Sequence, residues 1–215
     1  MKLNYKTFWR KSGLKGRWGE VYLGRVAKYK PKIFLEIGVF CGVTARNTCD
    51  YLFQVHGKNF NYIGVDLFGT HQQSKNDEIE PKFLEDQKFS NPLKNIYYNY
   101  ILKENLNSIE SVQKLLQEYS QNTKLIAGDT NKVLKEIDLQ KIDFVFLDGG
   151  HSYETVTNDL MILYGGMKDQ KKVILCDDYG KESYIAEVEK AIDDFTKKNN
   201  LKFNLIENRF AEIIT

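Results

Sequence analysis

Seven short apolar runs recur along the chain, and each has the length and continuity of a buried β-strand. Apolar residues at helical spacing separate the first six runs, so strands and amphipathic helices alternate. The predicted strands cover residues 33–37, 62–66, 124–129, 142–148, 172–178, 203–207 and 210–214. Strands that are apolar throughout, with helices between them, indicate a parallel sheet covered on both faces.

The last two runs are joined by only Asn208 and Arg209. So short a link permits an antiparallel hairpin but not a parallel crossover. We therefore predict an α/β fold of the Rossmann-like, doubly wound type, with a mostly parallel seven-stranded sheet and an antiparallel C-terminal hairpin. This ending is unusual for a plain dinucleotide-binding fold.

Residues 1–30 precede the first strand and do not follow the alternation. They carry Trp9, Trp18 and Tyr22 among several lysines and arginines. This composition predicts either a helical arm packed on the domain or an oligomer contact, and the second alternative is compatible with a homodimer. We divide the chain into this N-terminal arm and one domain at 31–215.

The stretch between the second and third strands is far longer than the usual connection in an α/β fold. Its second half predicts a helix with an Asn107–Glu110 capping pair and an apolar face at Ile109, Val112, Leu115, Leu116 and Tyr119. Its first half, an insertion at about 69–104, is polar with scattered aromatics. We interpret it as a lid or substrate loop, in which His71 could face the active site, or as an ordinary surface insertion.

Composition narrows the class of protein. The 215 residues, 42% of them hydrophobic, suit one globular domain. A net charge of +2 spread along the chain makes a nucleic-acid partner unlikely. Cys41, Cys49 and Cys176 have no metal-binding spacing and are expected to be buried thiols. With neither a signal-like N-terminus nor an apolar run long enough for a membrane span, we expect a cytoplasmic protein.

Acidic residues stand at or just after the ends of the first five predicted strands, and the carboxyl ends of parallel strands are where such sheets bind ligands. Carboxylates repel one another and are costly to desolvate without partners. Hydroxyl donors, a cationic ligand or a metal would compensate them. The acids are Glu36, Asp66, Asp129, Asp148 and the pair Asp177–Asp178.

The first half of the sheet carries a glycine turn between Gly38 and Gly42. It lacks both the G-K-[ST] of a phosphate loop and the third glycine of a dinucleotide fingerprint. Glu36 directly before it disfavours a pyrophosphate, so we expect a positively charged ligand without phosphate. Asp66 is placed to accept both hydroxyls of a ribose, and Asp129 to accept from an adenine amine. Taken singly, each acid could instead be a helix cap or turn residue.

The glycine turn and the acids that follow it resemble those of a known enzyme family. The segment 36–42, E-I-G-V-F-C-G, is similar to motif I of class I S-adenosylmethionine-dependent methyltransferases. The acids that follow and the final strand pair match the same order over residues 31–215. The resemblance implies S-adenosylmethionine as the cofactor. It also implies a set of binding residues: Glu36, Gly38, Phe40, Gly42, Asp66, Leu67, Gly128, Asp129, Thr130 and Asp148.

The second half resembles a narrower group, the metal-dependent sugar O-methyltransferases of the macrocin and mycinamicin type. The similarity rests on D-G-G-H at 148–151 and D-D-Y at 177–179. It implies that Asp148, Asp177 and Asp178 hold Mg²⁺ and that His151 is the general base, with Asp148 and His151 as the catalytic pair. Gly150 departs from those members that carry another acid there, which places more weight on His151.

The chemistry of these residue types agrees with the resemblance. Three carboxylates make an all-oxygen site that suits Mg²⁺ better than Zn²⁺. A bound cation lowers the pKa of a hydroxyl, and an imidazole, with an ordinary pKa of about 6.5, can take its proton. Alternatively, His151 only supports neighbouring residues or binds a ligand without a metal. The Asp177–Asp178 pair is then a helix cap plus one catalytic acid.

The sequence thus predicts a divalent-metal-assisted O-methyltransferase that acts on a hydroxyl of a sugar, glycan or other polyhydroxylated small molecule. Three alternatives stay open. They are a metal-independent methyltransferase of the same fold, an NAD-dependent oxidoreductase, and a family member that binds but does not catalyse.

Overall fold

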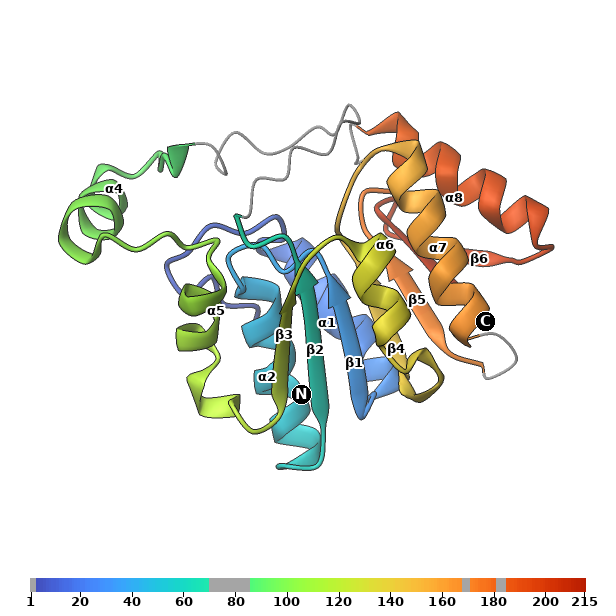
Figure 1. Cartoon of the computed structure of the whole chain (residues 1–215), viewed down its shortest axis with the longest axis horizontal. Helices are drawn as coiled ribbons and strands as arrows, with labels where there is room; N and C mark the ends of the chain where they lie inside the picture. Colours follow the sequence, from blue (N-terminus) through green and yellow to red (C-terminus); the bar gives the residue numbers. More distant parts are fainter. Residues whose placement is uncertain (1–2, 70–85, 168–170, 181–184) are drawn as a thin grey trace.

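The computed structural model describes residues 3–69, 86–167, 171–180 and 185–215, and a seven-stranded sheet forms its centre (Figure 1). The strand order is β3-β2-β1-β4-β5-β7-β6. β1 to β5 are parallel, and β7 runs antiparallel to both β5 and β6. The predicted fold class is therefore confirmed. The strands are β1 Ile33–Ile37, β2 Asn61–Asp66, β3 Thr123–Ala127, β4 Phe144–Leu147, β5 Val173–Cys176, β6 Phe203–Ile206 and β7 Phe210–Ile214.

Helices cover both faces of the sheet. Buried residues of α1, α2 and α5 form one core with one face, and those of α6, α7 and α8 form a second core with the other (Figure 1). The helices are α1 Arg17–Tyr29, α2 Val43–His56, α4 Pro92–Ile96, α5 Ile109–Leu115, α6 Thr130–Val133, α7 Tyr153–Met167 and α8 Ala186–Lys198. A π-helical segment follows α4 at Tyr97–Leu102, and 3-10 turns lie at Gln117–Tyr119, Leu134–Glu136 and Leu139–Lys141.

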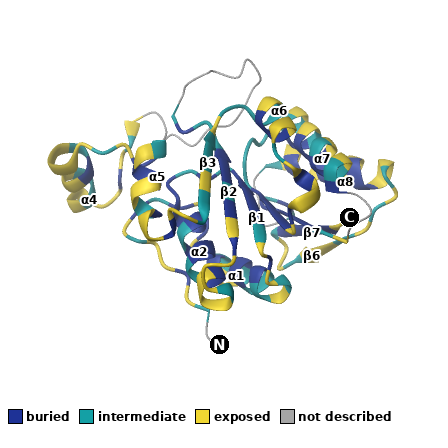
Figure 2. Cartoon of the chain, turned by 60° about the horizontal axis from the view of Figure 1, so that its bottom comes forward, coloured by how far each residue is buried: buried dark blue, intermediate teal, exposed yellow. Residues whose placement is uncertain are grey.

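The central strands are apolar throughout because both of their faces are covered. In β1, Phe34 packs into the first core, whereas Leu35 and Ile37 pack into the second. In β4, Phe146 and Leu147 divide in the same way. Figure 2 shows the consequence: the central strands are largely buried, whereas most of the exposed surface lies on helices and connections. Alternating side chains thus serve two cores.

The predicted C-terminal hairpin is present, but its tight turn is centred on Glu207 and Asn208, one residue before the predicted link. Glu207 and Asn208 take φ values of 54° and 56°, and the Arg209 N–H donates to the Ile206 carbonyl oxygen at 3.1 Å. Positive φ at both central positions is the geometry of a type I′ turn, whose twist matches that of paired strands. Because β7 is antiparallel to β5, this turn lies beside the carboxyl end of β5.

The N-terminal arm packs on the domain, which is the first of its two predicted arrangements. The Tyr22 hydroxyl lies 2.6 Å from Thr48 Oγ1, and Tyr5 and Leu14 are buried in the same core. Gly19 makes room for Tyr5, since a Cβ there would lie 2.1 Å from the ring. The arm is therefore part of the core beneath the first half of the sheet.

Arg10 ties the arm to two later segments. This buried guanidinium donates to the Cys41 carbonyl at 3.3 Å, to the Ser111 carbonyl at 3.1 Å and to Glu104 at 3.2 Å. Burial lowers the pKa of Arg10, and the Glu104 carboxylate opposes that shift. One side chain thus joins the arm, the glycine turn and the end of the insertion.

The insertion is described from residue 86 onward, and His71 lies outside the described residues. α4 stands away from the sheet, and most of its residues are exposed (Figures 1 and 2). Behind it, Phe89, Tyr98 and Leu106 form a small core with Cys41 of the glycine turn. The described part of the insertion therefore packs against that turn.

The predicted cap of α5 was wrong by one residue. Ser108, not Asn107, precedes the helix, and its Oγ accepts the Ser111 N–H at 3.2 Å. Its extended backbone, with φ of −90° and ψ of 151°, lets the hydroxyl reach back to the first turn. The helix also ends at Leu115, and Tyr119 lies in the 3-10 turn that follows.

None of the helices in the described part of the chain is long and apolar enough for a membrane crossing.

Candidate active site

The carboxyl edge of the sheet gathers the predicted acids because backbone pairing continues past the strand ends. The Asp148 N–H donates to the Ile37 carbonyl at 2.8 Å, and the Asp177 N–H donates to the Leu147 carbonyl at 3.0 Å. Asp66 closes β2 beside them. The acids of β1, β2, β4 and β5 consequently share one edge of the sheet.

The glycine turn passes closely over the end of β4. Gly38 has a φ of 89°, and a Cβ there would lie 1.8 Å from the Asp148 carbonyl oxygen. Phe40 also takes a positive φ, and the Gly42 N–H closes the turn on the Val39 carbonyl at 2.9 Å. Gly42, with a φ of 75°, directly precedes α2. The turn keeps its backbone open toward the sheet edge, which only glycine permits at position 38.

Asp66 is held by backbone amides. One of its oxygens accepts the Phe40 N–H and the other the Phe68 N–H, both at 2.8 Å. Burial raises the pKa of Asp66, and these backbone bonds oppose the shift. A carboxylate can accept about four hydrogen bonds, so acceptor capacity for ligand hydroxyls remains.

Glu36 lies beneath the turn and is fully buried. Its Oε2 accepts the Tyr62 hydroxyl at 2.6 Å, whereas its Oε1 has no hydrogen-bond partner among the described residues. Burial raises the pKa of Glu36 to about 8, with the nearby Asp66 adding to the shift. This oxygen lacks a donor, which a cationic ligand group would supply.

Asp129 serves as a helix cap. Its Oδ1 accepts the Asn131 N–H at 2.9 Å at the start of α6, which begins at Thr130. Gly128 connects it to β3 with a φ of 154°, and a Cβ there would lie 2.8 Å from Val133. The cap alternative is therefore present, and the adenine role of Asp129 stays a prediction. Leu67, next to Asp66, is half-buried at the same edge.

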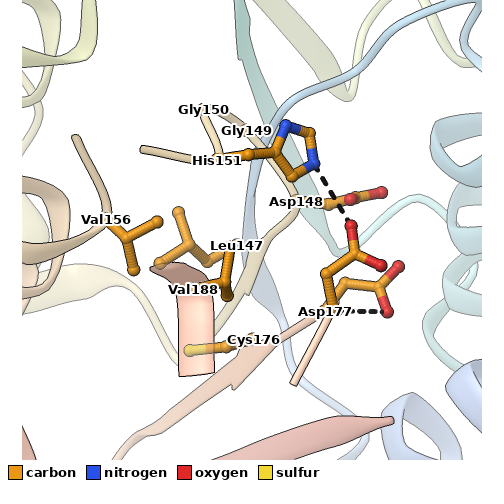
Figure 3. Close-up of a pocket in the computed structure, with 10 residues that line it drawn as sticks. Leu147, Asp148, Gly149, Gly150, His151, Val156, Cys176, Asp177 and Val188 are labelled. Atoms are coloured by element: carbon orange, nitrogen blue, oxygen red, sulfur yellow. Dashed lines mark hydrogen bonds and ion pairs between the residues drawn. The ribbon is translucent and has the colours of Figure 1, made fainter. Parts of the chain in front are cut away.

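The second half of the edge forms a pocket that brings three of the predicted residues together. One potential ligand atom from each of Asp148, His151 and Asp178 lies within 4.8 Å of the others. His151 Nε2 is 3.2 Å from Asp178 Oδ2. Figure 3 shows these polar groups at one end and apolar side chains at the other. The lining residues are Leu147, Asp148, Gly149, Gly150, His151, Val156, Cys176, Asp177, Asp178 and Val188.

Asp177 and Asp178 are neighbours in sequence but have different partners. The Asp177 carboxylate is buried and accepts two bonds from Arg209, at 2.7 Å from Nε and 2.8 Å from Nη2. Asp178 has a φ of 57°, a left-handed conformation that turns its side chain toward His151. The structure thus groups Asp178, but not Asp177, with Asp148 and His151.

In this pocket the acidic groups outnumber the positively charged groups. Burial raises the pKa of Asp148 well above its ordinary value, and the charges of Asp177 and Asp178 raise it further. Burial also raises the pKa of Asp177, against the effect of the Arg209 bonds. Three acids therefore share one guanidinium, and a bound cation would relieve the remaining repulsion.

Sequence reasoning missed Arg209, Tyr5, Ser12 and Thr44. The Tyr5 hydroxyl lies 2.9 Å from Thr44 Oγ1 and 3.3 Å from Ser12 Oγ, and a Cβ at Gly13 would lie 4.0 Å from Asp148 Oδ2. The arm therefore comes close to Asp148 at Gly13. For Arg209 a signal existed: the predicted hairpin places its turn at the carboxyl end of the preceding parallel strand.

The chain is similar to known proteins in its family and in its fold. Residues 35–179, more than half of the chain, match a family model described as a methyltransferase domain. No curated protein sequence matches the chain. Among solved structures, the O-methyltransferase NovP has a TM-score of 0.60 and 16% identity, over 92% of this chain and 80% of that one.

Two further structures have the same fold. The S-adenosylhomocysteine-bound methyltransferase PaMTH1 of Podospora anserina has a TM-score of 0.58 and 16% identity, over 93% of this chain and 79% of that one. CalS11, a TDP-rhamnose 3′-O-methyltransferase of calicheamicin biosynthesis, has a TM-score of 0.56 and 15% identity, over 90% and 77%. At such low identities the likeness concerns the fold.

Proposed function

The chain belongs to the methyltransferase-domain family and is an S-adenosylmethionine-dependent methyltransferase; from this premise we propose that it methylates a hydroxyl oxygen with the help of a divalent cation. The observation that carries the proposal is the cluster of Asp148, His151 and Asp178 beside the glycine turn. A base and a group of acids at this position suit the removal of a proton from an acceptor hydroxyl.

The donor side of the site suits S-adenosylmethionine, which supplies an electrophilic methyl group on a sulfonium centre. Asp66 is proposed to accept the ribose hydroxyls, and the unpartnered Oε1 of Glu36 suits an ammonium group. Gly38 lets the turn pack against the Asp148 backbone, so the two halves of the proposed site adjoin. The other proposed contacts are Phe40, Gly42, Leu67, Gly128, Asp129, Thr130 and Asp148.

The acidic cluster fits a divalent cation. Its donors include carboxylate oxygens, which Mg²⁺ prefers, and burial together with the charges of Asp177 and Asp178 raises the pKa of Asp148. When bound, Mg²⁺ would lower the pKa of an acceptor hydroxyl and orient it. The family resemblance implies that Asp148, Asp177 and Asp178 bind the cation. We propose that the cation binds at this cluster.

His151 is proposed as the general base. Asp178 lies 3.2 Å from its Nε2 and can fix the orientation of the ring. The imidazole takes the hydroxyl proton while the oxygen forms a bond to the methyl carbon and the bond from carbon to sulfur breaks. Asp148 and Asp178 hold His151 and the acceptor hydroxyl in the orientation that proton transfer requires.

We propose a sugar, glycan or other polyhydroxylated small molecule as the acceptor. NovP is an O-methyltransferase, and CalS11 is a TDP-rhamnose 3′-O-methyltransferase. A metal-independent methyltransferase is the alternative within the family. Membership in that family weighs against an NAD-dependent oxidoreductase.

Methyl transfer from isotopically labelled S-adenosylmethionine to a panel of glycosides and nucleotide sugars tests the proposal. We expect labelled methyl ethers, loss of transfer after exhaustive chelation, and recovery with Mg²⁺. Transfer that survives chelation would remove the cation from the proposal and leave the methyltransferase. Calorimetry with S-adenosylhomocysteine is the independent check, and a protein that does not bind it contradicts the donor side as well.

Three broader expectations stay predictions. A homodimer, a cytoplasmic location and the absence of a nucleic-acid partner follow from the sequence. The described part of the insertion exposes Leu93, Tyr100 and Ile101, with side chains suited to contact with an acceptor or another chain. Sedimentation analysis of the purified protein would establish its oligomeric state.

A further inference from the structure

The pairing of Arg209 with Asp177 separates two acids that the sequence presents as equivalent. Asp177 Oδ1 accepts from Arg209 Nε at 2.7 Å and from the Asp178 N–H at 2.8 Å, and its Oδ2 accepts from Arg209 Nη2 at 2.8 Å. Both oxygens of this buried carboxylate therefore already have donors. A cation could use Asp177 only if this bidentate pair separated.

Arg209 is also fixed from its other sides. Its guanidinium lies over the ring of Trp18 at 5.5 Å and that of Phe210 at 5.6 Å, and its carbonyl accepts the Tyr179 N–H at 2.8 Å. Its side chain is only 14% exposed. The planar fork, the two rings and the hairpin backbone thus hold one geometry, which a flexible lysine would not reproduce.

The second acid of the pair faces the pocket. Asp178 Oδ2 lies 3.2 Å from His151 Nε2, and Asp178 Oδ1 lies 3.6 Å from Arg209 Nη2. When the three acids are ionised and His151 is neutral, the acids and Arg209 together carry a net charge of −2. That charge matches one divalent cation. Mg²⁺ sites commonly use one or two carboxylates, with water and substrate oxygens completing the shell.

We infer that Arg209 is a positioning residue that keeps Asp177 out of the cation's coordination shell, so that Asp148 and Asp178 are the protein's carboxylate ligands. The inference rests on the proposed function and refines its cation site. Asp177 and Arg209 form a neutral pair that holds the turn at Asp178. The left-handed backbone of Asp178 then directs its carboxylate to the cation and to His151.

Manganese binding to three variants tests the inference, with Mn²⁺ followed by electron paramagnetic resonance. The double variant Asp177→Asn with Arg209→Gln keeps a neutral hydrogen-bonding pair and leaves the net charge of the cluster unchanged. We expect it to bind Mn²⁺ within about threefold of the wild type. Asp178→Asn retains a residue that tolerates positive φ, and we expect at least tenfold weaker binding.

The single variant Arg209→Gln gives a second readout, thermal unfolding with and without Mn²⁺. Its buried Asp177 loses its counter-charge, so we expect a lower Tm without metal and a larger Mn²⁺-induced rise in Tm than in the wild type. Equal rises in the two proteins would contradict the inference. Binding of S-adenosylhomocysteine by each variant shows that the donor side is folded.

The outcomes separate this inference from the proposed function. If the wild type binds Mn²⁺ but the double variant binds it as weakly as Asp178→Asn does, Asp177 is a ligand and the inference alone is wrong. If the wild type binds S-adenosylhomocysteine but no Mn²⁺, both the inference and the proposed cation site are wrong. The assignment as a methyltransferase is then unaffected. If the wild type binds neither, the proposed function itself is contradicted.

Discussion

The two halves of the sheet edge manage buried carboxylates in opposite ways. On the donor side, Asp66 accepts backbone N–H groups and Glu36 accepts a tyrosine hydroxyl, so neutral donors stabilise both acids. On the acceptor side, Asp148, Asp177 and Asp178 lie close together and share one guanidinium. Neutral donors leave acceptor capacity for hydroxyls and an ammonium group, whereas clustered acids call for a cation.

This difference teaches that similar residues at one sheet edge acquire different chemistry from their partners. The halves meet where Gly38 passes over the Asp148 carbonyl, but their carboxylates accept hydrogen bonds from different donors. Variants confined to one half should therefore affect binding or transfer separately.

His151→Gln should affect only the acceptor side. Loss of the base is expected to lower kcat by about 10²- to 10⁴-fold, because proton transfer contributes that much to catalysis. Affinity for S-adenosylhomocysteine should stay within about twofold of the wild type. Steady-state kinetics measure kcat, and calorimetry measures the affinity. A fall in cofactor affinity as large as the fall in kcat would contradict the separation of the donor and acceptor sides.

Asp66→Ala should affect only the donor side. Hydrogen bonds to a charged group contribute about 1.5–3 kcal/mol, so S-adenosylhomocysteine should bind about 100-fold more weakly by calorimetry. Asp143→Ala is the matched control, since Asp143 also accepts two backbone N–H groups, at 2.9 Å each from Lys32 and Ile33, but at the opposite end of the sheet. Similar losses in both variants would argue that Asp66 acts only through the fold.

Gly38→Ala probes the junction between the halves. Its Cβ would meet the Asp148 carbonyl at 1.8 Å, and its φ of 89° is strained for alanine. We expect a loss of about 2–4 kcal/mol in the free energy of unfolding, measured by urea denaturation. Gly24→Ala in α1 is the control, since nothing lies within 4 Å of the added Cβ, and it should gain about 0.5–1 kcal/mol. A tolerated Gly38→Ala would mean that the two halves are not in close contact.

Glu36→Gln sharpens the electrostatics of the donor side. The folded pKa of Glu36 is raised to about 8 from an ordinary value of 4.5, so the folded state holds an extra proton between these values. Stability must therefore fall as pH rises across this window and level off above it. The variant removes the titrating group, so its unfolding free energy should depend less on pH between about 4.5 and 8. Chemical denaturation at several pH values measures this, and equal slopes would contradict the assignment.

Much of the fold could be predicted because both faces of the sheet are buried. Strands such as β1 and β4 are apolar at every position except Glu36, and that continuity is visible without any structure. Helix ends were less certain. Asn107 and Ser108 are both good caps, and only the backbone angles decide for Ser108.

The candidate site could be predicted by its residue types but not by its pairings. The sequence presents Asp177 and Asp178 as one acidic pair, and a single left-handed residue directs them to different partners. Arg209 reaches Asp177 from the C-terminal hairpin, 32 residues further along the chain. Such contacts depend on packing over long sequence separations, which local patterns do not encode.

A crystal structure with S-adenosylhomocysteine and Mn²⁺, in which anomalous scattering locates the metal, tests the two-sided site most directly. We predict that the ribose hydroxyls bind Asp66 and that one manganese peak lies between Asp148 and Asp178, with Arg209 still paired to Asp177. A nucleoside bound elsewhere, or no manganese at the acidic cluster, would contradict it.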